Sequence, residues 1–277
     1  MFHIELLGNE FLDWQFYLIL FPIIFLYGIC VGSFLNVVIL RLPKNESLIK
    51  RGSHCMTCGE KIRRRDLIPV FSWLFLRGKC RNCGTKISAQ YPIVETLNAL
   101  AYIAALLALD VTPHAIIVCV LFSLLIVIGF MDWNTLEMDL RILLLIALLA
   151  IPSALLTDCL TIPQRLIGAV CISVPFFLIG EISGMILKKR TGEKVRGIEL
   201  GDTLLMAAAG LVLGPKTILV AAFIGIFLAA ICGLIYKRIT GESKFAFGPY
   251  LAIGIAVSAL FGNSIVQWYL SFILPQR

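Results

Sequence analysis

Eight apolar runs constrain the fold of this chain more than any other feature. They lie at about 16–40, 92–110, 114–131, 140–156, 166–187, 203–213, 217–236 and 248–274. Most of them approach the ~20 residues that a helix needs to cross the ~30 Å hydrocarbon core of a bilayer. With 59% hydrophobic and 15% charged residues, the chain is excluded from the ordinary soluble globular proteins. The sequence therefore predicts an all-α polytopic membrane protein with about eight transmembrane helices.

Basic residues are concentrated in the loop between the first two runs. Residues 41–91 carry half of the 24 lysines and arginines. Basic loops are retained in the cytoplasm, so this loop is predicted to lie on the cytoplasmic side of the membrane. Alternating the other loops across the membrane leaves only three basic residues outside, namely Arg165, Lys216 and Arg277. We therefore expect a multi-pass protein of the cytoplasmic (inner) membrane with both termini outward.

The distribution of basic residues argues against a signal peptide and against a nucleic-acid-binding protein. No Lys or Arg precedes the first run, which is the reverse of a signal peptide, so that run is kept as a membrane span. The net charge of +7 is explained by single-sign loops at a membrane surface. Membrane lipid is therefore an expected partner and nucleic acid is not.

Two C-x-x-C pairs lie in the basic loop, Cys55 with Cys58 and Cys80 with Cys83. Four thiolates in two such pairs are typical of a structural zinc site, and the reducing cytosol keeps the thiols available. A closed four-thiolate shell leaves no position for substrate, so the predicted zinc folds the loop and performs no chemistry. A metal-free or redox-labile loop is the alternative.

Carboxylates at the ends of apolar runs are the catalytic candidates, because ionisable groups near hydrocarbon are costly. Asp132 closes the third run, and Asp139 and Asp202 open the fourth and sixth, all on one predicted face. An aspartyl protease needs two carboxyls that share a proton, so we expect Asp202 to pair with one of the other two. Asp139 and Asp202 also fit helix N-caps. The cap is favoured for Asp139, and both alternatives stay open for Asp202.

The sixth run is too short for a full span. Residues 203–213 form only ~17 Å of helix, about half of the hydrocarbon core. Either the helix begins earlier, around Val195, or Gly201 and Asp202 lie well below the headgroups. Both alternatives place Asp202 near or inside the membrane.

Several motifs in order resemble the bacterial type IV prepilin peptidases. They are Gly32-Ser-Phe-Leu-Asn-Val-Val-Ile-Leu-Arg-Leu-Pro43, the two C-x-x-C pairs, Gly78-Lys-Cys80, Tyr91-Pro-Ile-Val-Glu95, Asp132, Gly201-Asp202 and Phe247-Gly-Pro-Tyr-Leu-Ala252. The resemblance covers about 30 to 260. It implies an enzyme that cleaves the leader of prepilins or pseudopilins on the cytoplasmic side after a glycine. It also implies methylation of the new N-terminus with S-adenosylmethionine.

The resemblance implies roles for single residues. Asp132 and Asp202 map onto the proteolytic pair of the family. Methyl transfer is associated with the N-terminal half, which makes four residues candidate contacts of S-adenosylmethionine: Gly32, Asn36, Lys79 and Glu95.

The chain is expected to divide into three parts. These are the N-terminus with the first span (1–40), the methyltransferase-associated cysteine loop (41–91) and the aspartyl peptidase bundle (92–277).

Three residues depart from the family pattern. Met138 stands where the family has Pro, Glu199 replaces the first Gly of G-x-G-D, and Leu204 occupies a position often held by Lys. Because two of these border the expected aspartyl pair, a second hypothesis is a degenerate, non-catalytic assembly factor of a pilus or secretion system. Such a factor would use the zinc loop for docking. A third class, an ion carrier built on the membrane acids, leaves the cysteine loop without a role. The oligomeric state and the physiological substrate are left open.

Overall fold

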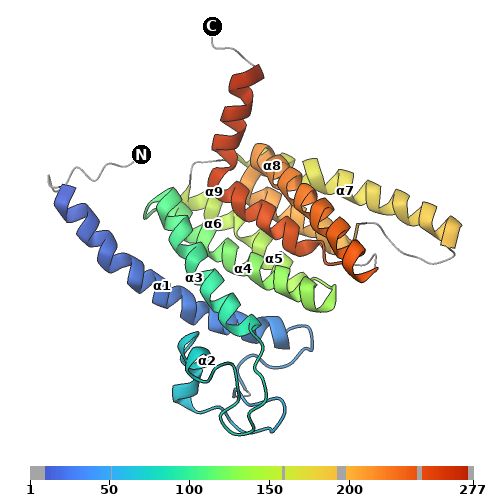
Figure 1. The fold of residues 1–277 in the computed structure, drawn as a ribbon. Coiled ribbons are helices and arrows are strands. Elements are labelled where there is room, and N and C mark those ends of the chain that lie inside the picture. Colours follow the sequence, from blue (N-terminus) through green and yellow to red (C-terminus); the bar gives the residue numbers. More distant parts are fainter. Residues whose placement is uncertain (1–9, 51, 158–159, 192–197, 242–244, 274–277) are drawn as a thin grey trace.

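A computed structural model describes residues 10–50, 52–157, 160–191, 198–241 and 245–273 (Figure 1). The described residues form helices and no β-strand, which confirms the all-α prediction. The elements in chain order are α1 (Glu10–Arg41), η1 (Arg64–Leu67), α2 (Phe71–Phe75), α3 (Gln90–Leu109), α4 (Pro113–Thr135), α5 (Leu140–Leu148), α6 (Ala150–Leu156), α7 (Ile162–Thr191), α8 (Leu200–Thr240) and α9 (Gly248–Ile273).

Six helices of the described chain are long and apolar enough to span a membrane, namely α1, α3, α4, α7, α8 and α9. The predicted run 140–156 forms the two shorter helices α5 and α6. The sixth and seventh predicted runs are the two parts of α8. The expected count of eight is therefore only approximate, because one run is divided into short helices and two others are joined.

The junction inside α8 is a sharp bend at Gly214. Its φ of 77° and ψ of 176° are not helical, and glycine adopts this conformation because it has no Cβ. Pro215 follows and starts the second part, where its fixed φ suits a first helical residue. The short run 203–213 therefore forms the first arm of a helical hairpin.

The two arms of α8 run in opposite directions. At the start of the first arm, a Cβ added to Gly201 would contact Met138, and so would a Cβ added to Gly248 at the start of α9. Just past the bend, Thr217 lies against Gly262, well along α9. Only residues 241–247 join the end of α8 to α9. Both ends of α8 therefore lie at the end of the bundle where α9 begins.

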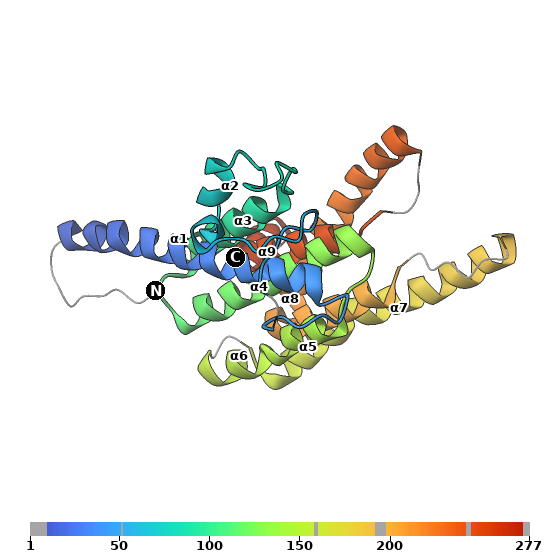
Figure 2. The same ribbon diagram turned by 90° about the horizontal axis from the view of Figure 1, so that it is seen from below.

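Close glycine contacts pack α1 against α3. A Cβ at Gly28 would come within 2.6 Å of the Cα of Ala99, and one at Gly32 within 2.6 Å of the Cα of Glu95. Small residues of this kind let helix backbones approach in a membrane, where apolar side chains alone give little drive for association. The contact positions the segment between α1 and α3, which contains η1, α2 and the cysteines, alongside these two helices, near the ends that it joins (Figures 1 and 2).

Candidate active and cofactor sites

Asp132 is buried in the last turn of α4, with 5% of its surface exposed. Its Oδ2 accepts a hydrogen bond of 2.8 Å from the backbone N–H of Gly248, the first residue of α9. The positive end of the α9 dipole therefore points toward this carboxyl group. A Cβ at Gly248 would lie 2.8 Å from the same oxygen, so glycine is needed for this close approach.

Asp202 is equally buried, in the first turn of α8. Its Oδ2 accepts a hydrogen bond of 3.2 Å from the N–H of Glu199, and the Glu199 carboxylate accepts one from the Asp202 N–H. This reciprocal pair is a capping box. The N-cap is therefore Glu199, and the interpretation of Asp202 as the N-cap is wrong, because the helix begins at Leu200. Val195, the earlier start that the sequence allowed for this helix, lies outside the described residues.

The fold brings the carboxyl groups of Asp132 and Asp202 together. They are close enough to interact electrostatically, and the charge of Glu199 acts on both of them. The Met138 side chain lies beside this pair. It would touch a Cβ placed at Gly201, next to Asp202, and its methyl end would touch one placed at Gly248. Two buried acids from α4 and α8 thus meet at one end of the bundle.

Asp139 has a different role. It is the N-cap of α5, and its Oδ1 accepts the N–H of Arg141 at 2.8 Å. The Arg141 guanidinium pairs with the same carboxylate at 2.6 Å and also donates to the carbonyl of Leu42. These hydrogen bonds hold the pKa of Asp139 below its ordinary value. The favoured prediction of a cap is confirmed, and Arg141, which this acid holds in place, ties α5 to the residue that follows α1.

The four loop cysteines converge on one point. Their sulfur atoms all lie within 4.8 Å of one another, so they could hold one metal ion. Gly59 and Gly84, which follow the two pairs, each have a φ of 71° and close the two tight turns. Hydrogen bonds from Thr85 lower the pKa of the Cys83 thiol to about 6, which favours the thiolate form that binds metal. The donor set and the turns fit a four-thiolate zinc site.

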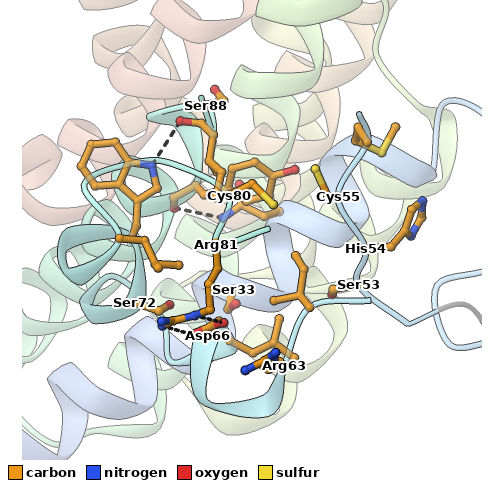
Figure 3. Close-up of a pocket in the computed structure, with 18 of the residues that line it drawn as sticks. Ser33, Ser53, His54, Cys55, Arg63, Asp66, Ser72, Cys80, Arg81 and Ser88 are labelled. Atoms are coloured by element: carbon orange, nitrogen blue, oxygen red, sulfur yellow. Dashed lines mark hydrogen bonds and ion pairs between the residues drawn. The ribbon is translucent and has the colours of Figure 1, made fainter. Parts of the chain in front are cut away.

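A cavity of about 400 Å³ lies between this loop and the adjoining ends of α1 and α3 (Figure 3). Asn36 of α1 is 2% exposed and lines it. The Asn36 Nδ2 donates to the carbonyl of Tyr91 at 3.1 Å, whereas the buried Oδ1 has no hydrogen-bond partner. A buried acceptor without a partner is costly, so this atom is suited to a ligand that brings a donor.

Glu95 of α3 lines the same cavity and holds the loop in place. Its Oε2 accepts the N–H of Val70 at 2.6 Å, and its side chain is also hydrogen-bonded to Ser33. Val70 has a φ of 60°, which is strained for a β-branched residue. Strain of this kind persists where the surroundings enforce it, as at ligand sites.

An ion pair crosses the wall of the cavity. Arg81 contacts Asp66 through two hydrogen bonds of 2.7 and 2.9 Å, drawn as dashed lines in Figure 3. These bonds lower the pKa of Asp66. The sequence analysis missed both residues, because they lie 15 positions apart in a loop without periodic structure and no local pattern joins them.

The structure separates the four predicted cofactor contacts. Asn36 and Glu95 line the cavity. Gly32 instead lies where α1 contacts the backbone of Glu95, and the exposed Lys79 forms a backbone bridge with Lys86. Two of the four residues taken from the family motifs therefore line the cavity, and Gly32 and Lys79 do not.

Comparison with known proteins decides the family. Residues 26–109 match the bacterial peptidase A24 N-terminal domain, and residues 119–234 match the type IV leader peptidase family. An Escherichia coli leader peptide-processing enzyme for type 4 prepilin-like proteins is 36% identical over 84% of this chain and 93% of its own length. The chain belongs to the type IV leader peptidase family.

Two other relatives match this chain over most of its length. The prepilin leader peptidase/N-methyltransferase of Aeromonas hydrophila is 33% identical over 91% of this chain and 94% of its own length. The Bacillus subtilis protein of that name is 28% identical over 91% of this chain and 98% of its own length. No solved structure matches. The first matched segment contains the cysteine loop and the cavity, and the second contains the paired aspartates.

Proposed function

We propose that this leader peptidase is an aspartyl endopeptidase that cleaves a type IV prepilin or pseudopilin leader after a glycine. The pairing of two buried carboxyls, Asp132 of α4 and Asp202 of α8, carries the proposal. One carboxylate takes a proton from the attacking water, and the other, protonated carboxyl donates a hydrogen bond to the scissile carbonyl. The proton then passes to the leaving amine. The Gly248 N–H keeps the Asp132 carboxyl in position during these steps.

The cleavage is assigned to the cytoplasmic side of the inner membrane. Arg141 follows α4 closely and Lys237 and Arg238 lie at the end of α8, so these basic residues share the bundle end with Asp132. Basic connections are retained in the cytoplasm. This orientation directs both termini outward and leaves residues 41–91 and 92–277 as the methyltransferase-associated and peptidase parts.

The cavity is proposed to bind S-adenosylmethionine, which supplies an electrophilic methyl group when bound. The Asn36 Oδ1 offers an acceptor for an amine of this cofactor, and the Glu95 carboxylate suits its positive charge. Zinc bound by the four cysteines holds the loop that covers the cavity.

The two sites adjoin one another. Asn134, two residues after Asp132, donates to Gln90 at 3.2 Å, and Gln90 precedes Tyr91 of the cavity wall. The new amine is therefore produced near the methyl donor. The alternative of a non-catalytic assembly factor is not favoured, because both acids of the pair are present and meet.

The test uses the purified full chain in detergent with a prepilin. Intact-mass analysis should show loss of the leader, and the mass of one methyl group should be added only with S-adenosylmethionine. Asn36→Ala should lose methylation and keep cleavage. Asn98→Ala is the matched control, because Asn98 also joins α3 to α1 but does not line the cavity. An intact prepilin after incubation with the folded wild type would overturn the proposal.

A further inference from the structure

The loop that carries the cysteines has an unusual apolar face. Phe71, Leu74 and Phe75 of α2 are 45%, 57% and 84% exposed, and Leu67 and Ile68 just before it are 43% and 51% exposed. Clusters of exposed large apolar side chains in a folded domain mark a contact with a partner or a membrane.

One hydrogen bond locates α2 along the bundle. Val70, the residue before α2, donates to Glu95, which lies five residues inside α3. At 1.5 Å per residue this is ~8 Å from the start of that span. Glu95 in turn contacts Gly32, nine residues before the end of α1, or ~13 Å along that helix. Figures 1 and 2 accordingly show α2 beside α1, level with its interior and not beyond its end.

The two spans beside α2 also expose apolar side chains near the contact between Val70 and Glu95. Phe34, adjacent to the Glu95 partner Ser33, is 52% exposed on α1, and Ile93 is 52% exposed on α3. A segment at this depth beside two spans lies at the level where acyl chains meet headgroups.

Exposed arginines flank the apolar face on both sides. Arg63, Arg64 and Arg65 precede it, and Arg77 lies two residues after the end of α2. Arginines near the surface of a bilayer attract anionic phospholipid headgroups. Apolar side chains at interfacial depth with a basic border are the pattern of a monotopic membrane anchor.

We infer that α2 is inserted into the membrane interface, with Phe71, Leu74 and Phe75 among the acyl chains and Arg64, Arg65 and Arg77 on phospholipid headgroups. The cysteine loop is thereby held against the bilayer and not free in the cytoplasm. Trp73 of the same helix lines the methyl-donor cavity, so the bilayer supports one wall of that site.

The test places the photo-crosslinker p-benzoylphenylalanine at position 75 of the full chain in nanodiscs of phosphatidylethanolamine and phosphatidylglycerol. Position 34 is the control inside the bilayer. Position 56 is the matched control outside it, because Met56 is an apolar side chain of the same loop, 79% exposed, next to the metal ligand Cys55. After illumination, mass spectrometry of the peptides identifies the adducts.

Phospholipid adducts at positions 34 and 75, with none at 56, are expected. A lipid adduct at 34 without one at 75 would overturn the inference. So would a crosslink from position 75 to a second copy or to added prepilin, since the face would then bind protein. Replacing phosphatidylglycerol with phosphatidylcholine should lower the yield at 75 several-fold and leave position 34 unchanged. Equal yields at 75 would refute the role of the arginines.

Discussion

Gly248→Ala should damage cleavage far more than folding. The new methyl group would lie 2.8 Å from the Oδ2 of Asp132, whereas ordinary non-bonded contacts lie near ~3.5 Å. Asp132 must therefore retreat by roughly half an ångström or more, which weakens its 2.8 Å hydrogen bond from the Gly248 N–H. A catalytic group misplaced by ~1 Å costs about 100-fold in rate, so kcat should fall about 10- to 100-fold.

The contribution of Met138 to this clash can be separated. Its flexible end would also touch the new methyl group, but it can turn away at little cost. The double variant Met138→Ala/Gly248→Ala removes that contact and leaves the one with Asp132. We expect the double variant to remain as slow as Gly248→Ala in a single-turnover prepilin cleavage assay.

The stability of the Gly248→Ala variant has to be measured in parallel. Overpacking of one methyl group costs about 1–3 kcal/mol of unfolding free energy, so the folded fraction is determined by thermal unfolding and used to normalise the rate. Cleavage within twofold of the wild type, or full rescue by Met138→Ala, would show that Gly248 does not set the position of Asp132.

Three further outcomes are expected. Met138→Ala opens space beside the aspartates, so it should favour a prepilin that has Ala in place of Gly before the scissile bond. The ratio of kcat/KM for the Ala substrate to kcat/KM for the Gly substrate should rise about tenfold. An unchanged ratio would contradict this. The stability that the Asp66–Arg81 pair gives the loop should be present above the unfolded Asp pKa of ~4 and be lost as pH falls through the lowered folded pKa. Hydrogen exchange of residues 62–87 should show this loss, and Asp66→Asn should remove it; equal profiles would refute it. Zinc removal by a chelator should abolish methylation before cleavage. Zinc uptake by the metal-free protein should weaken as pH falls, because protons compete with the metal for the four thiolates; uptake that is constant down to pH 4 would count against it.

The sequence predicted the features that depend on composition along the chain. Apolar runs gave the helical class, because a polar backbone in lipid must be satisfied within each segment. The two C-x-x-C pairs predicted the cysteine cluster, since ligands close in sequence are brought together by one turn each. The cap at Asp139 followed from local preference.

Features that depend on tertiary packing were beyond the sequence analysis. The bend at Gly214 joins two apolar runs directly into the helical hairpin α8. Hydropathy detects the two runs but not the direct junction between them. The shift of the N-cap to Glu199 depends on a reciprocal bond with Asp202 that forms only when the helix begins at Leu200. The Asp66–Arg81 pair likewise depends on how the metal loop folds over the ends of α1 and α3.

Single-turnover cleavage of a prepilin by Asp132→Asn and Asp202→Asn tests the central claim most directly. Asn keeps the size of each side chain and its capacity to accept a hydrogen bond, but it cannot exchange a proton. Both variants should lose about 10³-fold or more in rate, while Asp139→Asn should stay close to wild type because Asn caps a helix as well as Asp does. Zinc content and thermal unfolding show that each variant is folded. Cleavage at the wild-type rate by either folded variant of the pair would contradict the aspartyl mechanism.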